Sequence, residues 1–165
     1  MEALAAFLGR ISSYNLLNNL IPGAIFCVLL KSFVGYDLIS VGIIELLIVF
    51  YFSGMVIGRI GSLIIEPVLR AVKVIDDRDH KLYVAAEQID QKISSISETN
   101  TMYRSIVATT FTVLIVKLYR SIIELQWEFG DALEWLLLIS LTVLFVFAYR
   151  KQTYYLVSRI DFYTK

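Results

Sequence analysis

The chain has 165 residues, a length that suits one domain, and its 15 Lys and Arg balance its 15 Asp and Glu. This balance argues against a nucleic-acid-binding module, which needs a basic surplus to neutralise phosphates. Hydrophobic residues make up 58% and charged residues only 18%, with a mean hydropathy of +0.70. Soluble domains usually have about 45–50% apolar and about 25% charged residues, so this composition is shifted toward that of membrane proteins. The single cysteine, Cys27, excludes an intrachain disulfide framework and a cysteine-rich zinc site.

Four apolar segments, separated by short polar ones, predict an all-α integral membrane protein with four transmembrane helices. Each segment is close to the roughly 20 residues that a helix needs to cross about 30 Å of hydrocarbon. Helix is also the conformation in which a single segment satisfies its own backbone in lipid. The predicted spans, within a single membrane domain covering 1–165, are about 16–35, 38–60, 105–125 and 132–149.

The second predicted span ends in a cluster of small residues, GMVIGRIGS at 54–62. At 100° per residue its small members share one narrow helix face; they are Gly54, Gly58, Gly61 and Ser62. Such a face lets two helix backbones approach closely in lipid, with either another span or another copy of the chain as partner. A phosphate-binding loop would need a preceding strand and a different spacing. We therefore predict helix packing here.

Just beyond this cluster, Glu66 and Arg70 lie one helical turn apart and are predicted to form an ion pair. Pro67 lies between them and lacks a backbone N–H. The helix is therefore predicted to kink or end there.

The segment of about 61–104 is predicted to be a cytoplasmic helical loop. Its apolar residues follow 3.6-residue spacing with polar residues opposite, which predicts one amphipathic helix of about four turns; they are Leu82, Ala86, Ile89, Ile93 and Ile96. This apolar face either packs on neighbouring helices or receives a cytoplasmic protein partner. Ser95 and Glu98 resemble a capping box at which the third helix begins.

Acidic residues before this helix could suggest a metal site, but Asp76, Asp77 and Asp79 lack the glycine and closing glutamate of a calcium loop. His80 is the only histidine, and no serine lies in a nucleophile elbow. We therefore expect a solvated turn, no metal or other cofactor, and no enzymatic activity.

Polar side chains within the predicted spans gather toward the outer leaflet. Glu45 lies seven residues into the second span, where an unpaired charge costs about 3 kcal/mol or more, so it must meet a cation or water. In one interpretation it pairs with Lys31 or Lys117 and fixes helix register. In the other, a polar layer lines a water-filled path in an oligomer. The candidate residues are Lys31, Glu45, Thr110, Lys117, Arg120 and Ser121.

The distribution of positive charge predicts the orientation. Twelve of the 15 Lys and Arg residues lie in the three segments 1–15, 59–104 and 150–165, which four spans place on one side. The positive-inside rule assigns that side, with both termini, to the cytoplasm. Glu45 and Gly54 fall on opposite faces of the second span, which predicts a helix contacted on both sides and hence a homo-oligomer.

Three stretches, YNLLNNLIPG (14–23), YFSGMVIGRIGSLIIEP (51–67) and SETNTMYR (97–104), resemble a family of small, largely uncharacterised bacterial multi-pass membrane proteins. Some members accompany antiphage defence systems as transmembrane effectors or accessory subunits. The resemblance implies an oligomeric inner-membrane protein that perturbs or permeabilises the membrane when a cytoplasmic partner triggers it. The alternative is a non-conducting anchor or scaffold that recruits a cytoplasmic protein through residues 74–100.

Overall fold

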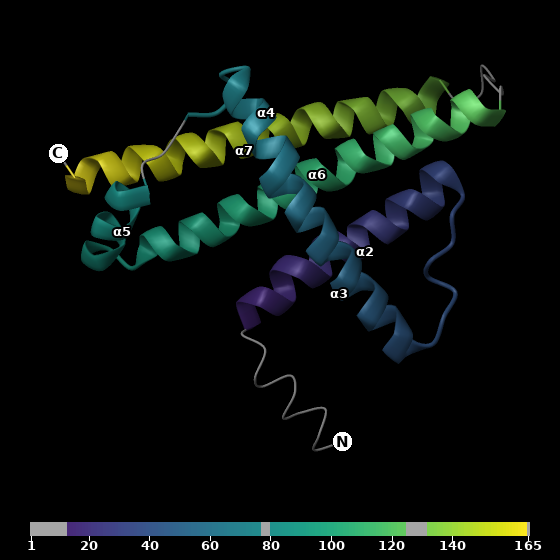
Figure 1. The fold of residues 1–165 in the computed structure, drawn as a ribbon, viewed down its shortest axis with the longest axis horizontal. Helices are drawn as coiled ribbons and strands as arrows, with labels where there is room; N and C mark the ends of the chain where they lie inside the picture. The colour runs from purple at the N-terminus through teal and green to yellow at the C-terminus, as the bar shows by residue number, and fades with distance from the viewer. Residues whose placement is uncertain (1–12, 77–79, 125–131, 165) are drawn as a thin grey trace.

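The computed structural model describes residues 13–76, 80–124 and 132–164 (Figure 1), and every element within them is helical. The all-α prediction is confirmed for this part of the chain. The elements are α2 (Ser13–Val34), α3 (Ile43–Ile60), the π-helix η1 (Gly61–Ile65), α4 (Glu66–Ala71), α5 (His80–Ile89), α6 (Lys92–Glu124) and α7 (Ala132–Thr164).

Two long helices set the frame of the molecule. α6 and α7 have 33 residues each, lie side by side and run in opposite directions (Figure 1). At 1.5 Å per residue each is about 50 Å long. α2 lies along the C-terminal half of α6 and runs in the same direction, and α3 crosses both α2 and α6 (Figure 1). α5 packs on the C-terminal end of α7, at the end of the molecule away from α2 (Figure 1).

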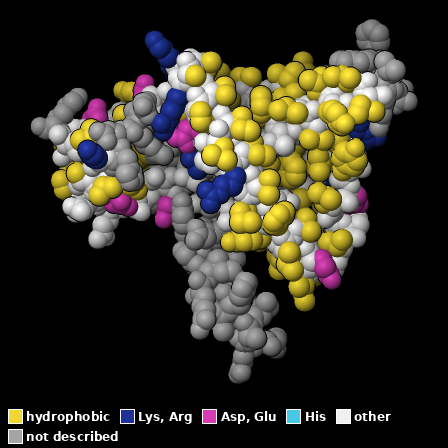
Figure 2. Space-filling view, in the orientation of Figure 1, with side chains coloured by type: hydrophobic (Ala, Val, Ile, Leu, Met, Phe, Trp, Pro, Cys, Tyr) yellow, Lys and Arg dark blue, Asp and Glu magenta, His cyan; other side chains and the backbone are white. Residues whose placement is uncertain are grey.

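Three helical segments of the described chain are long and apolar enough to cross a membrane: Ile43–Ala71, Lys92–Ile123 and Ala132–Thr164. The predicted first span corresponds to α2, whose apolar part, Asn18–Val34, is shorter. In Figure 2, hydrophobic side chains form a broad surface over one part of the molecule, whereas most charged side chains gather toward the end that holds α5. Broad contiguous apolar surfaces of this kind mark sites of contact with membranes or with other proteins.

The second predicted span begins later than expected, at Ile43 rather than near residue 38. The connection before it is held outside the helix by Asp37, whose Oδ1 accepts the backbone N–H groups of Ile39 and Ser40 at 2.9 and 3.1 Å. Short polar side chains that bond to nearby backbone favour such turns over helix. As a result Glu45 lies in the first turn of α3 rather than deep within it.

Pro67 does not end the helix that contains it, because α3, η1 and α4 continue without a break to Ala71. The N–H of Glu66 bonds to the Gly61 carbonyl, an i to i−5 bond that adds one residue to the turn. Pro67 follows this wider turn as the second residue of α4, and its missing N–H removes one backbone bond from the continuous helix. The helix therefore does not end at Pro67, and the predicted alternative, a kink there, stays a prediction.

The helix instead ends in a Schellman motif, in which the N–H of Val74 bonds to Leu69 O and the N–H of Lys73 bonds to Arg70 O, both at 2.9 Å. Lys73 occupies the left-handed position, with φ of +58°. This position usually holds glycine. The motif turns the chain back toward α7, where Ile75 is buried.

The predicted four-turn loop helix is two elements. α5 ends at Ile89, and α6 begins at Lys92. Asp90 separates the two helices. Its N–H donates to Ala86 O in the last turn of α5, and its carboxylate accepts the N–H of Lys92, the first residue of α6, at 3.0 Å. The third helix therefore begins before the predicted start at Ser95, and one continuous helix carries both the last part of the loop and the third span.

Candidate functional site

α2 and α3 touch backbone to backbone at a crossing built from two glycines. A Cβ atom added to Gly54 would lie 1.7 Å from the carbonyl oxygen of Asn19, and one added to Gly23 would lie 1.8 Å from that of Phe50. No side chain fits at either position unless the helices separate. The small-residue face thus has a partner within the same chain, as close helix packing requires.

The remaining small residues of this face meet α6 or their own helix. A Cβ on Gly61 would lie 3.3 Å from Arg104 Cγ, whereas a Cβ on Gly58 would meet nothing closer than 3.9 Å. The hydroxyl of Ser62 donates to the carbonyl of Arg59 at 3.1 Å. Tight packing is therefore concentrated at Gly54.

Gly23, the second glycine of this crossing, was missed by the sequence reasoning. In the structure Pro22 lies inside α2. The available signal was the spacing of Gly23 and Cys27, two small residues one turn apart. Cys27 is fully buried, and its thiol lies 3.8 Å from the hydroxyl of Ser53 on α3.

The charges near the connected ends of α2 and α3 do not form the predicted pairs with Glu45. Lys31 pairs with Asp37 at 2.8 Å, and Lys117 pairs with Glu134 at 2.5 Å. Glu45 is exposed and forms no ion pair with a described residue. Its position in the first turn of α3 explains this, because a carboxylate there is stabilised by the helix dipole and lies near the end of the span.

Lys117 is the most enclosed of the charged residues in this layer. Its side chain is 6% exposed, and its ammonium also lies over the rings of Phe33 and Trp135, at 5.9 and 5.5 Å from their centroids. Arg120 lies over the ring of Tyr36 at 5.7 Å. These cation–π contacts give both cations aromatic partners within the chain. Outside the spans, the Lys31 ammonium and then the Ser40 hydroxyl lower the pKa of Asp37.

The members of the predicted polar layer that lie on α6 do not form a continuous polar face. Thr110, Lys117 and Ser121 are all buried within the chain, but Thr110 and Lys117 are about 10 Å apart along the helix. Between them lies an apolar cluster of Leu30, Val34, Val113 and Leu138, and the last two are fully buried. The hydroxyl of Thr110 donates to the Val107 carbonyl rather than to another polar side chain.

Beyond the apolar segments, α5 and the adjoining ends of α6 and α7 form a small helical unit with its own core. We call residues 80–104 and 150–164 the head. Ala86 from α5 and Ile93 from α6 pack on Leu156 and Ile160 from α7, and all four are buried. Ile96 is partly buried beside them, whereas Leu82 and Ile89 are exposed. Three of the five residues of the predicted apolar face thus pack within the chain.

Polar contacts also hold the head together. Arg159 Nε donates a hydrogen bond to Asp90 Oδ2 at 2.7 Å, and Arg159 Nη2 forms an ion pair with the same oxygen at 2.6 Å. The Arg159 guanidinium, followed by the Lys92 N–H, lowers the pKa of the Asp90 carboxyl, and Asp90 in turn raises the pKa of Arg159. A buried hydrogen bond of 3.0 Å joins Thr153 on α7 to Asn100 on α6. The head is therefore positioned by groups from all three of its helices.

A buried carboxylate fastens α4 to α6. Glu66 is 8% exposed and accepts hydrogen bonds of 2.5 Å from both Arg70 and Arg104. The contact with Arg70 is the predicted helix pair. The contact with Arg104 was missed, because the two residues are 38 positions apart and nothing local connects them.

Potential metal-ligating side chains do not gather in groups of three or more within residues 13–76, 80–124 and 132–164. Of the acidic turn before α5, Asp77 and Asp79 lie outside these ranges.

Comparison of the chain with family models, curated proteins and solved structures gives no match. Its class therefore follows from the fold: a helical protein with three helices long and apolar enough to cross a membrane and a shorter apolar helix packed against two of them. The family resemblance inferred from the sequence remains a prediction.

Proposed function

We propose that the chain is a multi-pass inner-membrane protein that anchors a cytoplasmic partner through the head. Four spans would place both termini and residues 61–104 on the cytoplasmic side. This is the anchor or scaffold function considered from the sequence, and it includes an accessory subunit of a defence system.

The observation that carries this proposal is the length of α6 and α7. Each helix is about 50 Å long, whereas the hydrocarbon of a bilayer is about 30 Å thick. If both helices cross the membrane, about 20 Å of each would lie beyond the hydrocarbon, and α5 packs on one end of this pair. Crossing the membrane does not require such an extension, so we assign the partner-binding role to it.

The head offers large side chains to a partner. Tyr154, Tyr155 and Phe162 on α7 are 65%, 52% and 78% exposed. Aromatic residues are enriched in the energetically important centres of protein interfaces. Leu82 and Ile89 add exposed apolar area on α5. These five residues, rather than the buried Ala86 and Ile93, are the contacts that we assign to the partner.

The orientation is tested with two isosteric substitutions in whole cells. Ser40→Cys lies in the connection between α2 and α3 and Ser158→Cys lies on the head, and both positions are exposed. A membrane-impermeant maleimide should label Ser40→Cys in intact cells and Ser158→Cys only after the inner membrane is opened. Labelling of Ser158→Cys in intact cells would reverse the orientation and remove the basis of the proposal.

The partner is tested with a photo-cross-linking amino acid at Phe162 and, as a matched control, at Val143 on the apolar part of α7, which is 47% exposed. We expect a protein cross-link from position 162 only. The purified captured protein should then bind liposomes that contain this chain and should not bind the Phe162→Ser variant. Cross-links from position 162 to lipid alone, or to another copy of the chain, would contradict the anchor function.

A second candidate is the membrane-permeabilising effector, an oligomer in which polar residues line a path. The observation in its favour is the apolar cluster around Val113 and Leu138, with Thr110 on one side and Lys117 on the other. Apolar constrictions between polar segments can gate a channel by excluding water. In this candidate the partner opens the constriction.

One pair of neighbouring residues separates the two candidates. Leu138→Ser places a hydroxyl within the constriction, whereas Leu137→Ser places it on an exposed face, since Leu137 is 49% exposed and Leu138 is buried. In proteoliposomes, an effector should show increased potassium flux with Leu138→Ser and no increase with Leu137→Ser. An anchor should show no increase with either variant.

A further inference from the structure

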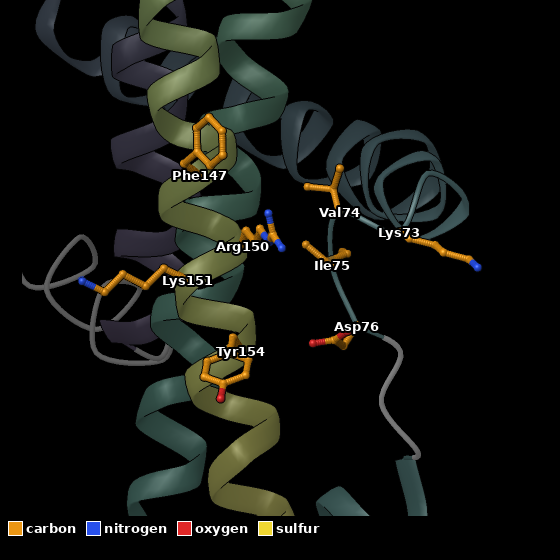
Figure 3. Close-up of a pocket in the computed structure, with 8 residues that line it drawn as sticks. All are labelled: Lys73, Val74, Ile75, Asp76, Phe147, Arg150, Lys151 and Tyr154. Carbon is orange, nitrogen blue, oxygen red and sulfur yellow. The ribbon is translucent and has the colours of Figure 1, made fainter.

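A cavity of about 330 Å³ lies between the turn after α4 and the middle of α7 (Figure 3). It has an apolar side and a polar side, and it contains basic residues together with one acid. Its lining residues are Lys73, Val74, Ile75, Asp76, Phe147, Arg150, Lys151 and Tyr154.

The walls of this cavity are fixed by buried neighbours. Ile75 is 6% exposed and Tyr149 is 1% exposed, and both belong to the same core cluster. Ile75 therefore holds the extended segment after α4 in place, and Tyr149 sets the rotation of α7 about its axis. Arg150 and Asp76, each adjacent to one of these anchors, are placed on opposite walls.

The directions of the charged side chains differ. In Figure 3 Arg150 projects from α7 toward Val74 and Ile75, and Asp76 projects back toward α7. Lys73 and Lys151 project away from the cavity on its two sides. Neither Arg150 nor Asp76 forms an ion pair with a described residue. The cavity thus holds a cation and an anion that form no ion pair with each other.

The cavity also lies where the apolar part of α7 ends. Phe147 belongs to the apolar stretch and is 60% exposed. Arg150 and Lys151 follow one turn later, and Tyr154 lies one turn beyond them. In the membrane placement proposed above, Phe147 would face acyl chains, while Arg150 and Asp76 would lie at the level of the inner headgroups.

We propose that this cavity binds the headgroup of an inner-leaflet phospholipid that carries a primary ammonium after its phosphate, as phosphatidylethanolamine does. The guanidinium of Arg150 matches a phosphate diester, because its planar donors can bond two phosphate oxygens. The carboxylate of Asp76 matches the ammonium, which sits two carbons beyond the phosphate. Lys73 and Lys151 attract phosphate-bearing lipids to the rim.

Asp76 is the residue that sets the headgroup preference. A lipid with a net negative headgroup would bring its phosphate to Arg150 without offering a cation to Asp76. A quaternary ammonium has no N–H to donate to the carboxylate. The cavity should therefore prefer a primary ammonium headgroup over both glycerol and choline headgroups.

The test is lipid binding to the delipidated full chain in detergent, measured by native mass spectrometry with an equimolar mixture of phosphatidylethanolamine, phosphatidylcholine and phosphatidylglycerol of identical acyl chains. The wild-type chain should bind phosphatidylethanolamine at least about fivefold more tightly than either competitor, a preference of about 1 kcal/mol. Asp76→Asn should abolish this preference and retain phosphatidylglycerol binding. Arg150→Gln should weaken binding of all three lipids.

Arg59→Gln is the matched control, because Arg59 is an exposed cation at the end of α3 and does not line this cavity. It should leave the preference unchanged. Equal binding of the three lipids to the wild type, an unchanged preference in Asp76→Asn, or loss of preference in Arg59→Gln would each overturn the proposal. Competition by water-soluble glycerophosphoethanolamine at the concentration of the lipid would assign the site to a soluble ligand and overturn the lipid assignment.

The inference rests on the proposed membrane placement and not on the partner of the head. Binding in detergent is independent of orientation in cells and of any captured protein. A failed lipid preference would therefore leave the anchor proposal standing, and a failed cross-link would leave the lipid site standing.

Discussion

Replacing Gly54 with alanine should force α2 and α3 apart, although the added group is a single methyl. The new Cβ would lie 1.7 Å from Asn19 O, a backbone atom that cannot rotate away. Ordinary contact begins at about 3.4 Å, so the helices must separate by roughly 1.5 Å or bend, and overpacking of this kind costs about 1–3 kcal/mol. The control is Gly58→Ala, where the Cβ would meet nothing closer than 3.9 Å. This control should be neutral or stabilise the helix by up to about 1 kcal/mol.

The chain carries its own reporter for this crossing. Cys27 is the only cysteine; it is fully buried and lies beside Ser53, the neighbour of Gly54. Its reaction with a small membrane-permeant maleimide therefore requires local opening of the α2–α3 contact. A cost of 1–3 kcal/mol corresponds to an increase in labelling rate of about 5-fold to 150-fold for Gly54→Ala. Equal rates in Gly54→Ala, Gly58→Ala and wild type would refute the backbone contact between α2 and α3.

Three further changes test other parts of the structure. Glu134→Gln should destabilise the fold by about 1–3 kcal/mol in mixed-micelle unfolding, because it leaves the buried Lys117 without its counter-charge; an unchanged midpoint would mean that water already solvates Lys117. Lys73→Gly should stabilise the fold by about 1 kcal/mol in the same assay, since the left-handed backbone favours glycine, and a loss of stability would contradict that conformation. Arg159 lowers the pKa of Asp90 in the folded state. The contact therefore stabilises the head fully above about pH 3.9, the pKa of an unfolded aspartate, and this stabilisation is lost as the pH falls through the lower pKa of folded Asp90. Hydrogen exchange of α5, corrected for intrinsic rates, should therefore rise between pH 5 and pH 3 in the wild type, and Asp90→Asn should remove that dependence.

The length and hydrophobicity of the apolar segments correctly predicted an all-α fold. Both properties can be taken from neighbouring residues, without knowledge of contacts between distant parts of the chain. The same reasoning misplaced the start of α3. Leu38, Ile39 and Val41 are apolar and extend the hydrophobic run, but Asp37 binds the backbone of the following residues and keeps them out of the helix. Glu45 was consequently assigned to the interior of the span. A single polar side chain therefore outweighed the average hydropathy.

Contacts between distant residues were harder to predict. Periodicity identified the apolar face that contains Ala86 and Ile93, but it joined them in one helix across Asp90. The partners of that face on α7, Leu156 and Ile160, come about 60 or more residues later. Tertiary packing decides which side of an amphipathic helix is buried, and one sequence carries little information about such pairing.

The continuity of α6 and α7 across the boundary of the head has a mechanical consequence. Neither helix contains a proline, and within the described residues each is a single uninterrupted helix. A lateral displacement of one end is therefore transmitted along the helix, because no hinge interrupts it. In the proposed membrane placement, about 20 Å of each helix would lie outside the hydrocarbon and about 30 Å inside it, so each helix would act as a lever that pivots at the inner boundary. A 2 Å displacement at the tip of the head would then swing the far end by about 3 Å, which is comparable to the helix shifts that switch other proteins. An anchored partner would thus gain a direct means of moving the opposite surface of the membrane assembly.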